Sequence, residues 1–286
     1  MKKTNIEDGF PEVNLLDEKL IKQIRSDFRG PIIGVIGATS PDYYYSADNG
    51  IIAGYLIRKF LAKNKEFTNT RFAQGNGSGH LFTGGVEGVG LDVYLGAAMY
   101  AKENKVPSKF FALIPEFNMV PVYGGGDEEG YGFVGFVGSM ARPTSFNQVP
   151  YDIPAAYYNT ARLLGEKCKE VRAGEDMSER RAYVAAVADV LVVLNGGHGT
   201  LDEAVTAIER GVPVIVVQNT GGAAKDIADR KNNKFVPDRG TSKHAKFVKF
   251  AVPHRLEDKT LNMDLVHVAF DEWDIPDTLE YVIKKK

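Results

Sequence analysis

The chain of 286 residues is poor in residues that form disulfides or metal sites. Its one cysteine, Cys168, can neither pair within the chain nor build a zinc site made of cysteines. Its five histidines include no H-E-x-x-H motif and no Cys–His pair at metal-binding spacing. We therefore expect no metal and no disulfide framework, which suits a protein of the reducing cytoplasm.

Long apolar runs and an excess of one charge are also missing. The longest apolar runs, such as residues 190–194 and 213–217, have the length of strands, whereas a membrane helix needs about 20 apolar residues. No apolar stretch follows the basic start of the chain, so we expect no secretory signal. The net charge of −2 argues against a protein that coats duplex DNA or an anionic membrane. We expect a cytoplasmic protein whose partner is neither a nucleic acid polymer nor a membrane.

What the sequence does contain is a regular alternation of strand-like and helix-like segments. Buried-strand patterns occupy residues 31–37, 110–114, 190–194, 213–217, 247–252 and 266–270. Helical patterns occupy residues 15–28, 49–64, 91–104, 155–169, 177–188, 200–210 and 276–283. This order predicts an α/β fold in three layers, a Rossmann-like, doubly wound, mostly parallel sheet with helices on both faces. No linker divides the chain, so we predict a single domain over residues 1–286.

The alternation breaks at residues 115–150, which are rich in glycine, proline and aromatic residues. A loop of this length without structure of its own is unusual inside a compact domain. We interpret the segment as an insertion, either a small β structure or a mobile lid. A role for its aromatic residues in binding a partner is a further hypothesis.

Glycine-rich turns follow several strand candidates, at the edge where parallel sheets bind ligands. The first turn, residues 34–40, includes Gly37, Thr39 and Ser40. It lacks the G-x-G-x-x-G spacing of an NAD site, and a plain strand-to-helix turn explains it equally well. The second, residues 83–90, begins with Thr83, Gly84 and Gly85. Such glycines let a phosphate approach the backbone beside the free N–H groups of a helix N-terminus.

The third turn, residues 195–203, leads from a buried strand through glycines directly into a helix. Asn195-Gly196 is also a hairpin signal, although a helix and not a second strand follows it. Thr200 and Glu203 have the spacing of a capping box, in which the threonine caps the helix and the glutamate reaches back. Taken alone, the capping interpretation is favoured.

Residues 195–203 resemble the P-G-G-x-G-T-x-x-E motif of the LOG ("lonely guy") family. These proteins are nucleoside 5′-monophosphate phosphoribohydrolases, long mislabelled as lysine decarboxylases. Residues 177–181 resemble the family's M-x-x-R-K motif, and residues 83–90 and 34–40 resemble its first glycine turn and its opening strand and turn. Asn195 replaces the usual proline, and Arg181 replaces lysine. The resemblance covers most of the chain outside the N-terminal helix and residues 115–150.

The resemblance implies hydrolysis of the N-glycosidic bond of AMP-like nucleotides, cytokinin nucleotides among them, to free base and ribose 5-phosphate. Glu203 would stabilise the oxocarbenium-like transition state. Arg180 would hold the phosphate or ribose, or orient Glu203. The residues implied to bind substrate are Gly37, Thr39, Ser40, Thr83, Gly84, Gly85, Met177, Arg181, Gly196, Gly197, His198, Gly199 and Thr200. No metal or redox cofactor is implied, and the protein would be a homodimer or a larger homo-oligomer.

Each of these features also has a plainer interpretation. The same fold could bind or sense a nucleotide-derived ligand without cleaving it. The presence of both Arg180 and Glu203 favours the enzyme, because a pure binder has no need for this carboxylate, which would repel an anionic ligand. Asp202 fits simple compensation of the helix dipole. For the aromatic run at residues 43–45, stacking on a base and partial burial under the sheet are both open.

Overall fold

The computed structural model describes the chain in parts, which together hold most of the predicted sheet. Described are residues 16–28, 30–38, 43–64, 79–85, 88–107, 109–114, 169–174, 177–234, 256 and 258–284. For residues 120–122, 133–135 and 177–178, only the backbone is described. All statements below concern these residues.

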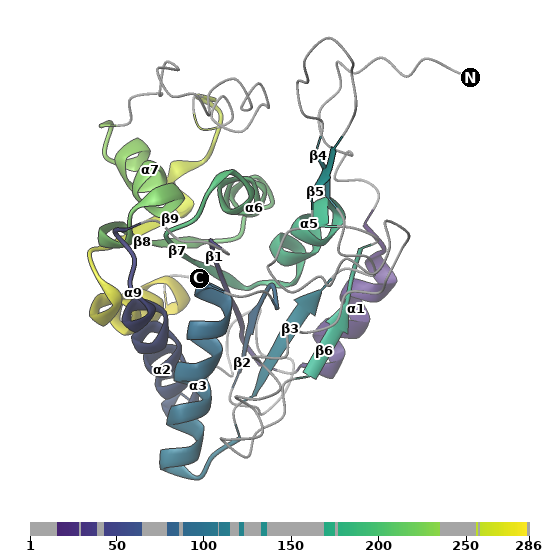
Figure 1. Ribbon diagram of the computed structural model, residues 1–286, viewed down its shortest axis with the longest axis vertical. Helices are drawn as coiled ribbons and strands as arrows, with labels where there is room; N and C mark the ends of the chain where they lie inside the picture. The colour runs from purple at the N-terminus through teal and green to yellow at the C-terminus, as the bar shows by residue number, and fades with distance from the viewer. Residues whose placement is uncertain are drawn as a thin grey trace.

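A parallel sheet of seven strands forms the centre of the described structure (Figure 1). Its order is β6-β3-β2-β1-β7-β8-β9, and each neighbouring pair is parallel. The strands are β1 (Ile32–Gly37), β2 (His80–Thr83), β3 (Phe110–Ile114), β6 (Lys169–Arg172), β7 (Val190–Leu194), β8 (Val214–Val217) and β9 (Val266–Ala269). The predicted α/β fold with a parallel sheet is confirmed.

Helices cover both faces of the sheet and form two separate hydrophobic cores. On one face lie α1 (Glu18–Asp27), α5 (Met177–Val187), α6 (His198–Glu209) and α7 (Gly222–Lys231). On the other lie α2 (Ala47–Lys63), α3 (Val89–Asn104) and α9 (Ile275–Lys284). Short 3-10 turns are η2 (Gln218–Thr220), η4 (Met263–Leu265) and η5 (Glu272–Asp274).

The strands β1, β3, β7 and β8 are apolar along their whole length because they are buried from both sides. In β8, Val214 and Val216 enter the first core, whereas Ile215 and Val217 enter the second. Because these strands have no polar face, they need helices on both sides, and this accounts for the three layers. Among the described residues, no helix is both long and apolar enough to cross a membrane.

Within the predicted insertion, residues 115–150, the structure describes two short strands. They are β4 (Val120–Val122) and β5 (Phe133–Gly135), which pair antiparallel. The remainder of the segment lies outside the described residues. Its interpretation as a small β insertion or a lid remains a prediction.

Several element predictions need correction. Two strands were not predicted: β2 stands in a segment expected to be a turn, and β6 begins at Lys169, where a helix was expected to end. The helix α7 was not predicted either. Residues 155–168 and the strand expected at 247–252 lie outside the described residues. Helix α6 begins at His198, two residues before the predicted start.

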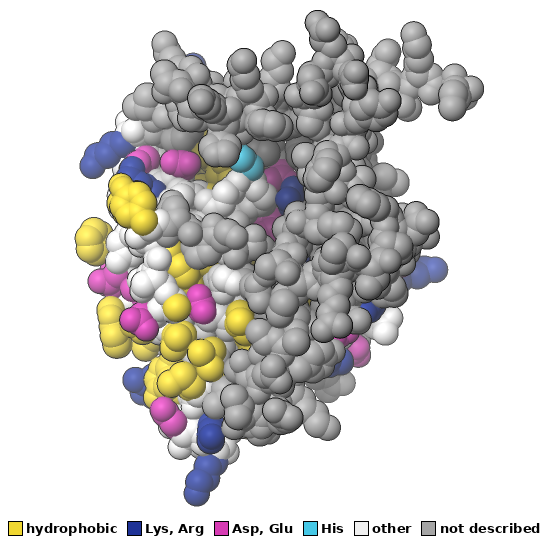
Figure 2. All heavy atoms as spheres, viewed as in Figure 1, with side chains coloured by type: hydrophobic (Ala, Val, Ile, Leu, Met, Phe, Trp, Pro, Cys, Tyr) yellow, Lys and Arg dark blue, Asp and Glu magenta, His cyan; other side chains and the backbone are white. Residues whose placement is uncertain are grey.

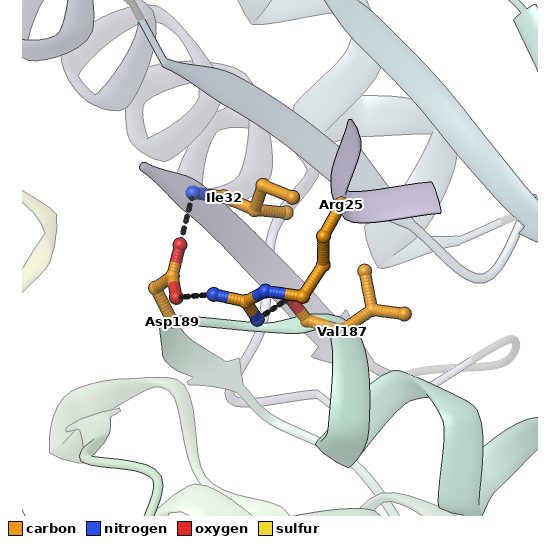
Figure 3. Close-up of polar contacts among 4 residues, drawn as sticks. All are labelled: Arg25, Ile32, Val187 and Asp189. Carbon is orange, nitrogen blue, oxygen red and sulfur yellow. Dashed lines mark hydrogen bonds and ion pairs between the residues drawn. The ribbon is translucent and has the colours of Figure 1, made fainter. Parts of the chain in front are cut away.

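A buried polar cluster ties α1 to the sheet (Figure 3). The Asp189 Oδ2 atom accepts a hydrogen bond from the Ile32 N–H at 2.9 Å, and its other oxygen pairs with Arg25 of α1. Arg25 Nη1 also donates to the Val187 carbonyl at 3.0 Å. The hydroxyl of Tyr183 in α5 accepts from the Asp17 N–H at 2.9 Å. These contacts fix α1 against α5, the helix that carries Arg180.

Candidate active site

The candidate site lies where the order of the strands reverses. From β1 the chain builds β2, β3 and β6 on one side, and then β7, β8 and β9 on the other. Open parallel sheets bind ligands beyond the carboxyl ends of their strands at such a point. The glycine loop at residues 195–199 follows β7, and Gly84 and Gly85 follow β2. Two predicted ligand-binding turns therefore lie at the same edge of the sheet.

Arg180 of α5 and Glu203 of α6 form a buried ion pair. Arg180 Nη2 donates to Glu203 Oε1 at 2.7 Å, and each side chain is only 6% exposed. The structure thus brings together the two residues predicted to be catalytic. Because both are buried, each depends on the other to compensate its charge.

The Arg180 guanidinium also lies against the backbone at Gly84. A Cβ atom placed on Gly84 would overlap Arg180 Nη1, so a side chain here would displace the guanidinium. The buried Nε atom of Arg180 has no hydrogen-bond partner among the described residues. Arg180 therefore keeps donor capacity beyond its bond to Glu203.

Burial raises the pKa of the Glu203 carboxyl above its ordinary value. The positive charges of Arg180 and Arg181 oppose this rise in pKa, and the negative charge of Asp202 adds to it. The arginine neighbours therefore offset part, but not all, of the cost of burying the charged form of Glu203. A carboxyl in this balance can exchange a proton closer to neutral pH than an exposed glutamate does.

A second pair of charges lies beside the first on the same two helices. Arg181 Nη1 lies 3.8 Å from Asp202 Oδ2, and both side chains are largely buried. A Cβ atom on Gly199 would lie 2.7 Å from Arg181 Nη2, so this guanidinium rests against the glycine loop. The interpretation of Asp202 as compensation of the helix dipole is wrong, because the first turn of α6 holds no acidic residue. The sequence did contain a signal for the Arg181–Asp202 pair. Asp202 directly precedes Glu203, and Arg181 directly follows Arg180.

The glycine loop enters α6 through an unusual backbone. Asn195 and Gly196 both have positive φ angles, of 53° and 107°, and Gly197 is the N-cap without a side-chain cap. The capping box is therefore wrong: Thr200 is the third residue of α6, and Glu203 bonds to Arg180 instead of reaching back. A hairpin at Asn195 is wrong as well, because α6 follows. An N-terminus with no side-chain cap suits an anion.

The remaining residues that were predicted to bind substrate differ in how far they are exposed. Gly197 and His198 are exposed, whereas Thr200 and Thr83 are buried. The Gly85 N–H donates to Thr83 Oγ1 at 3.3 Å. Gly37 ends β1 enclosed by other elements, because a Cβ there would lie 2.6 Å from that of Val89. Thr39 and Ser40 lie outside the described residues, as does the side chain of Met177.

The aromatic run at residues 43–45 is buried only in part, and its stacking on a base stays a prediction. Tyr43 and Tyr44 are 84% and 56% exposed and lie against each other, with ring centroids 4.0 Å apart. Tyr45 is buried, and its hydroxyl donates to Asp92 Oδ2 at 2.9 Å. Tyr44 also packs at Gly221, since a Cβ there would lie 2.7 Å from the Tyr44 Cβ. Among the described residues, no cluster of three or more His, Cys, Asp or Glu side chains could hold a metal ion.

Comparisons with known proteins agree with the motifs in the second half of the chain. The family model described as "SLOG in TRPM, prokaryote" matches residues 168–258, which include Arg180 and Glu203. A probable cytokinin riboside 5′-monophosphate phosphoribohydrolase from Oryza sativa subsp. japonica is 38% identical over 87 residues, or 30% of this chain and 39% of that protein. A cytokinin riboside 5′-monophosphate phosphoribohydrolase from Arabidopsis thaliana is 38% identical over 91 residues, or 32% and 40% of the two chains.

Solved structures show a weaker likeness. A molybdenum cofactor binding protein from Rippkaea orientalis is 15% identical, with a TM-score of 0.46 over 89% of this chain and 98% of that one. A molybdenum cofactor carrier protein from Chlamydomonas reinhardtii is 17% identical, with a TM-score of 0.43 over 90% and 99% of the two chains. Neither likeness says anything about the ligand of this chain.

The match with the curated relatives spans about two fifths of their length. It nevertheless concerns the same family that the arginine and glycine motifs predict. Over about a third of its length, this chain is therefore a sequence relative of the LOG phosphoribohydrolases.

Proposed function

We propose that this protein hydrolyses the N-glycosidic bond of nucleoside 5′-monophosphates, with AMP-like nucleotides, including cytokinin nucleotides, as substrates. The observation that carries the proposal is the buried Arg180–Glu203 pair beside the uncapped N-terminus of α6. The activity named for the two sequence relatives supports the same chemistry.

In this proposal, the glycine loop binds the 5′-phosphate. The N–H groups at the start of α6 and the helix dipole favour a negative charge there. Arg181, which rests against Gly199, adds a positive charge beside the loop. Binding energy from the phosphate then holds the ribose in place and lowers the barrier at C1′.

Glu203 provides the negative charge that the reaction needs. As the bond from C1′ to the base breaks, positive charge develops on the sugar, and a nearby carboxylate stabilises it. Water then forms the new bond to C1′, and its proton leaves with the base or to solvent. Arg180 favours the ionised form of the carboxylate and holds it in place, and its Nε remains available to the substrate. The chemistry requires no metal and no redox cofactor.

The test is to incubate the protein with AMP, GMP, CMP and their deoxy forms and to measure released base by chromatography. We expect Glu203→Gln to lose at least about a hundredfold in turnover per folded molecule, because the stabilising charge is removed. It should also lose some stability, because the buried Arg180 loses its counter-charge. Glu209→Gln, at the exposed end of the same helix, is the matched control and should keep wild-type activity. Wild-type turnover by Glu203→Gln would refute the mechanism.

One observation favours a second candidate function. Glu203 is directly paired with Arg180, so its charge repels an anionic ligand less than a lone carboxylate would. The alternative is therefore a binder or sensor of a nucleotide-derived ligand. Tight binding of the same nucleotides without release of base, by titration calorimetry, would select this alternative.

The active form, in this proposal, is a homodimer or a larger homo-oligomer that acts in the cytoplasm on a small-molecule nucleotide. Its mass can be measured by light scattering after size-exclusion chromatography.

A further inference from the structure

We infer that Asn195 and Thr220 form a positioning pair that holds the glycine loop in the conformation that receives a phosphate group. The inference rests on the proposed function in one respect, that this loop binds the phosphate. It adds Thr220, from the turn after β8, which lies outside the three glycine motifs.

Three short hydrogen bonds define the pair, and all of them are buried. The Asn195 N–H donates to Thr220 Oγ1 at 2.7 Å, and the Asn195 Nδ2 atom donates to the Thr220 carbonyl at 2.7 Å. The Thr220 hydroxyl in turn donates to the Val217 carbonyl at 2.6 Å. Asn195 is 2% exposed and Thr220 is fully buried. The hydroxyl therefore accepts and donates at once, and this links the end of β7 to the end of β8.

The N-terminus of α7 supports the same loop from behind. The Ala223 N–H donates to the Gly196 carbonyl at 2.8 Å, and the Ala224 N–H donates to the Asn195 carbonyl at 3.1 Å. Gly222, with a φ of 53°, lies so close that a Cβ on it would overlap the Gly196 carbonyl oxygen. The first N–H groups of α7 are thus used to hold the loop, whereas the N-terminus of α6 faces outward with the exposed Gly197 and His198.

The backbone of Asn195 explains why the loop needs this support. Its φ of 53° lies in the left-handed region, which asparagine tolerates and which the proline ring cannot adopt. The family's proline motif therefore cannot give this loop its shape. Here the shape depends on side-chain hydrogen bonds, and removing the Thr220 hydroxyl would leave the buried Asn195 N–H without that acceptor.

Two variants separate the positioning role from general stability. Thr220→Val keeps the size of the side chain and removes the hydroxyl, and Thr220→Ser restores it. Ile215→Val is the control for lost packing. It removes a buried methyl group of β8 from the core under α2, α3 and α9. Amide hydrogen exchange of the free protein reports on the loop without any reaction. We expect the amides of residues 195–201 to exchange at least about tenfold faster in Thr220→Val, and at the wild-type rate in Thr220→Ser and Ile215→Val.

Kinetics and binding give the second measurement. We expect Thr220→Val to raise KM and the Kd for AMP by about tenfold or more, with a smaller fall in kcat, and Thr220→Ser to recover most of the affinity. Unchanged exchange, or a fall in kcat with unchanged KM, would overturn the inference. If the wild-type protein neither binds nor cleaves AMP, the proposed function fails, while the exchange measurement still decides whether the pair holds the loop.

Discussion

At the scale of single residues, Gly84 decides where the Arg180 guanidinium can lie. The nearest atoms to a Cβ on Gly84 all belong to the flexible end of Arg180. Gly84→Ala should therefore shift the guanidinium and distort its ion pair with Glu203 without moving the backbone. We expect the free energy of unfolding to change by less than about 1 kcal/mol, and kcat/KM to fall by about tenfold or more. Urea unfolding and nucleotide hydrolysis measure the two effects.

Gly96→Ala is the contrasting control. A Cβ on Gly96 would overlap the Ile51 carbonyl, so α2 and α3 would have to move apart. This variant should lose about 2 kcal/mol or more of stability while the surviving folded fraction keeps its activity. Equal stability losses for the two variants, with no difference in activity, would contradict the role given to Gly84.

Residue types and spacing predicted which side chains meet, but not how the loop is built. Arg180 and Glu203 were expected at one site, and the structure brings them together. The local Thr-x-x-Glu pattern gave the wrong partner for Glu203, because a partner on a neighbouring helix competes with a helix cap and spacing along the chain cannot show it. The positive φ angle of Asn195 could not be predicted either, because the residue that supports it through hydrogen bonds, Thr220, lies in another turn.

At the scale of elements, Asp189 joins the start of β1 to α1. Its carboxylate is 2% exposed and satisfies the buried Ile32 N–H as well as Arg25. Asp189→Ala should cost about 2–4 kcal/mol, because it leaves a buried donor and a cation without this partner. Chemical unfolding measures the loss. Glu280→Ala, which breaks the exposed Lys284–Glu280 pair on α9, is the control and should cost at most about 0.5 kcal/mol.

A small effect of Asp189→Ala, equal to that of the control, would show that α1 is held by its apolar contacts alone. Those contacts are substantial, since Ile21, Ile24 and Phe28 are buried in the first core.

Elements with a strong apolar pattern were predictable, and the others were not. β3 and β7 are apolar throughout and were predicted with their observed bounds. β2 has four residues in a glycine-rich setting, so its apolar pattern is too short to stand out. β6, at the edge of the sheet, has the sequence Lys-Glu-Val-Arg and remains partly exposed, so it lacks the apolar run of a central strand. α7 begins at Gly222, directly after its N-cap Gly221, and a sequence alone presents such a pair of glycines as a loop.

At the scale of the whole molecule, an apolar surface over α2 and α3 bears on the proposed oligomer. Hydrophobic side chains gather there in Figure 2. Leu91, Leu95 and Met99 recur every four residues on α3 and are only half-buried. If a second copy covers this stripe, the wild-type protein should have twice the mass of 31.4 kDa in solution. Leu95→Glu should then shift it to the monomer, because a charge cannot be buried there without a partner.

Light scattering measures the masses, and Lys22→Glu, at an exposed position of α1 on the other face of the sheet, should leave the oligomer intact. A wild-type protein that stays monomeric at micromolar concentration would refute the proposed assembly.

The division of the core into two affects which substitutions the chain can tolerate during evolution. Both charge pairs of the candidate site come from α5 and α6, which share one core with α1 and α7. The opposite core, under α2, α3 and α9, touches the site chiefly where Val89 meets Gly37. Substitutions that repack that far layer can accumulate with little effect on the reacting groups. Descendants of one ancestor could thus acquire new subunit contacts or a different thermal tolerance there while their chemistry stays the same.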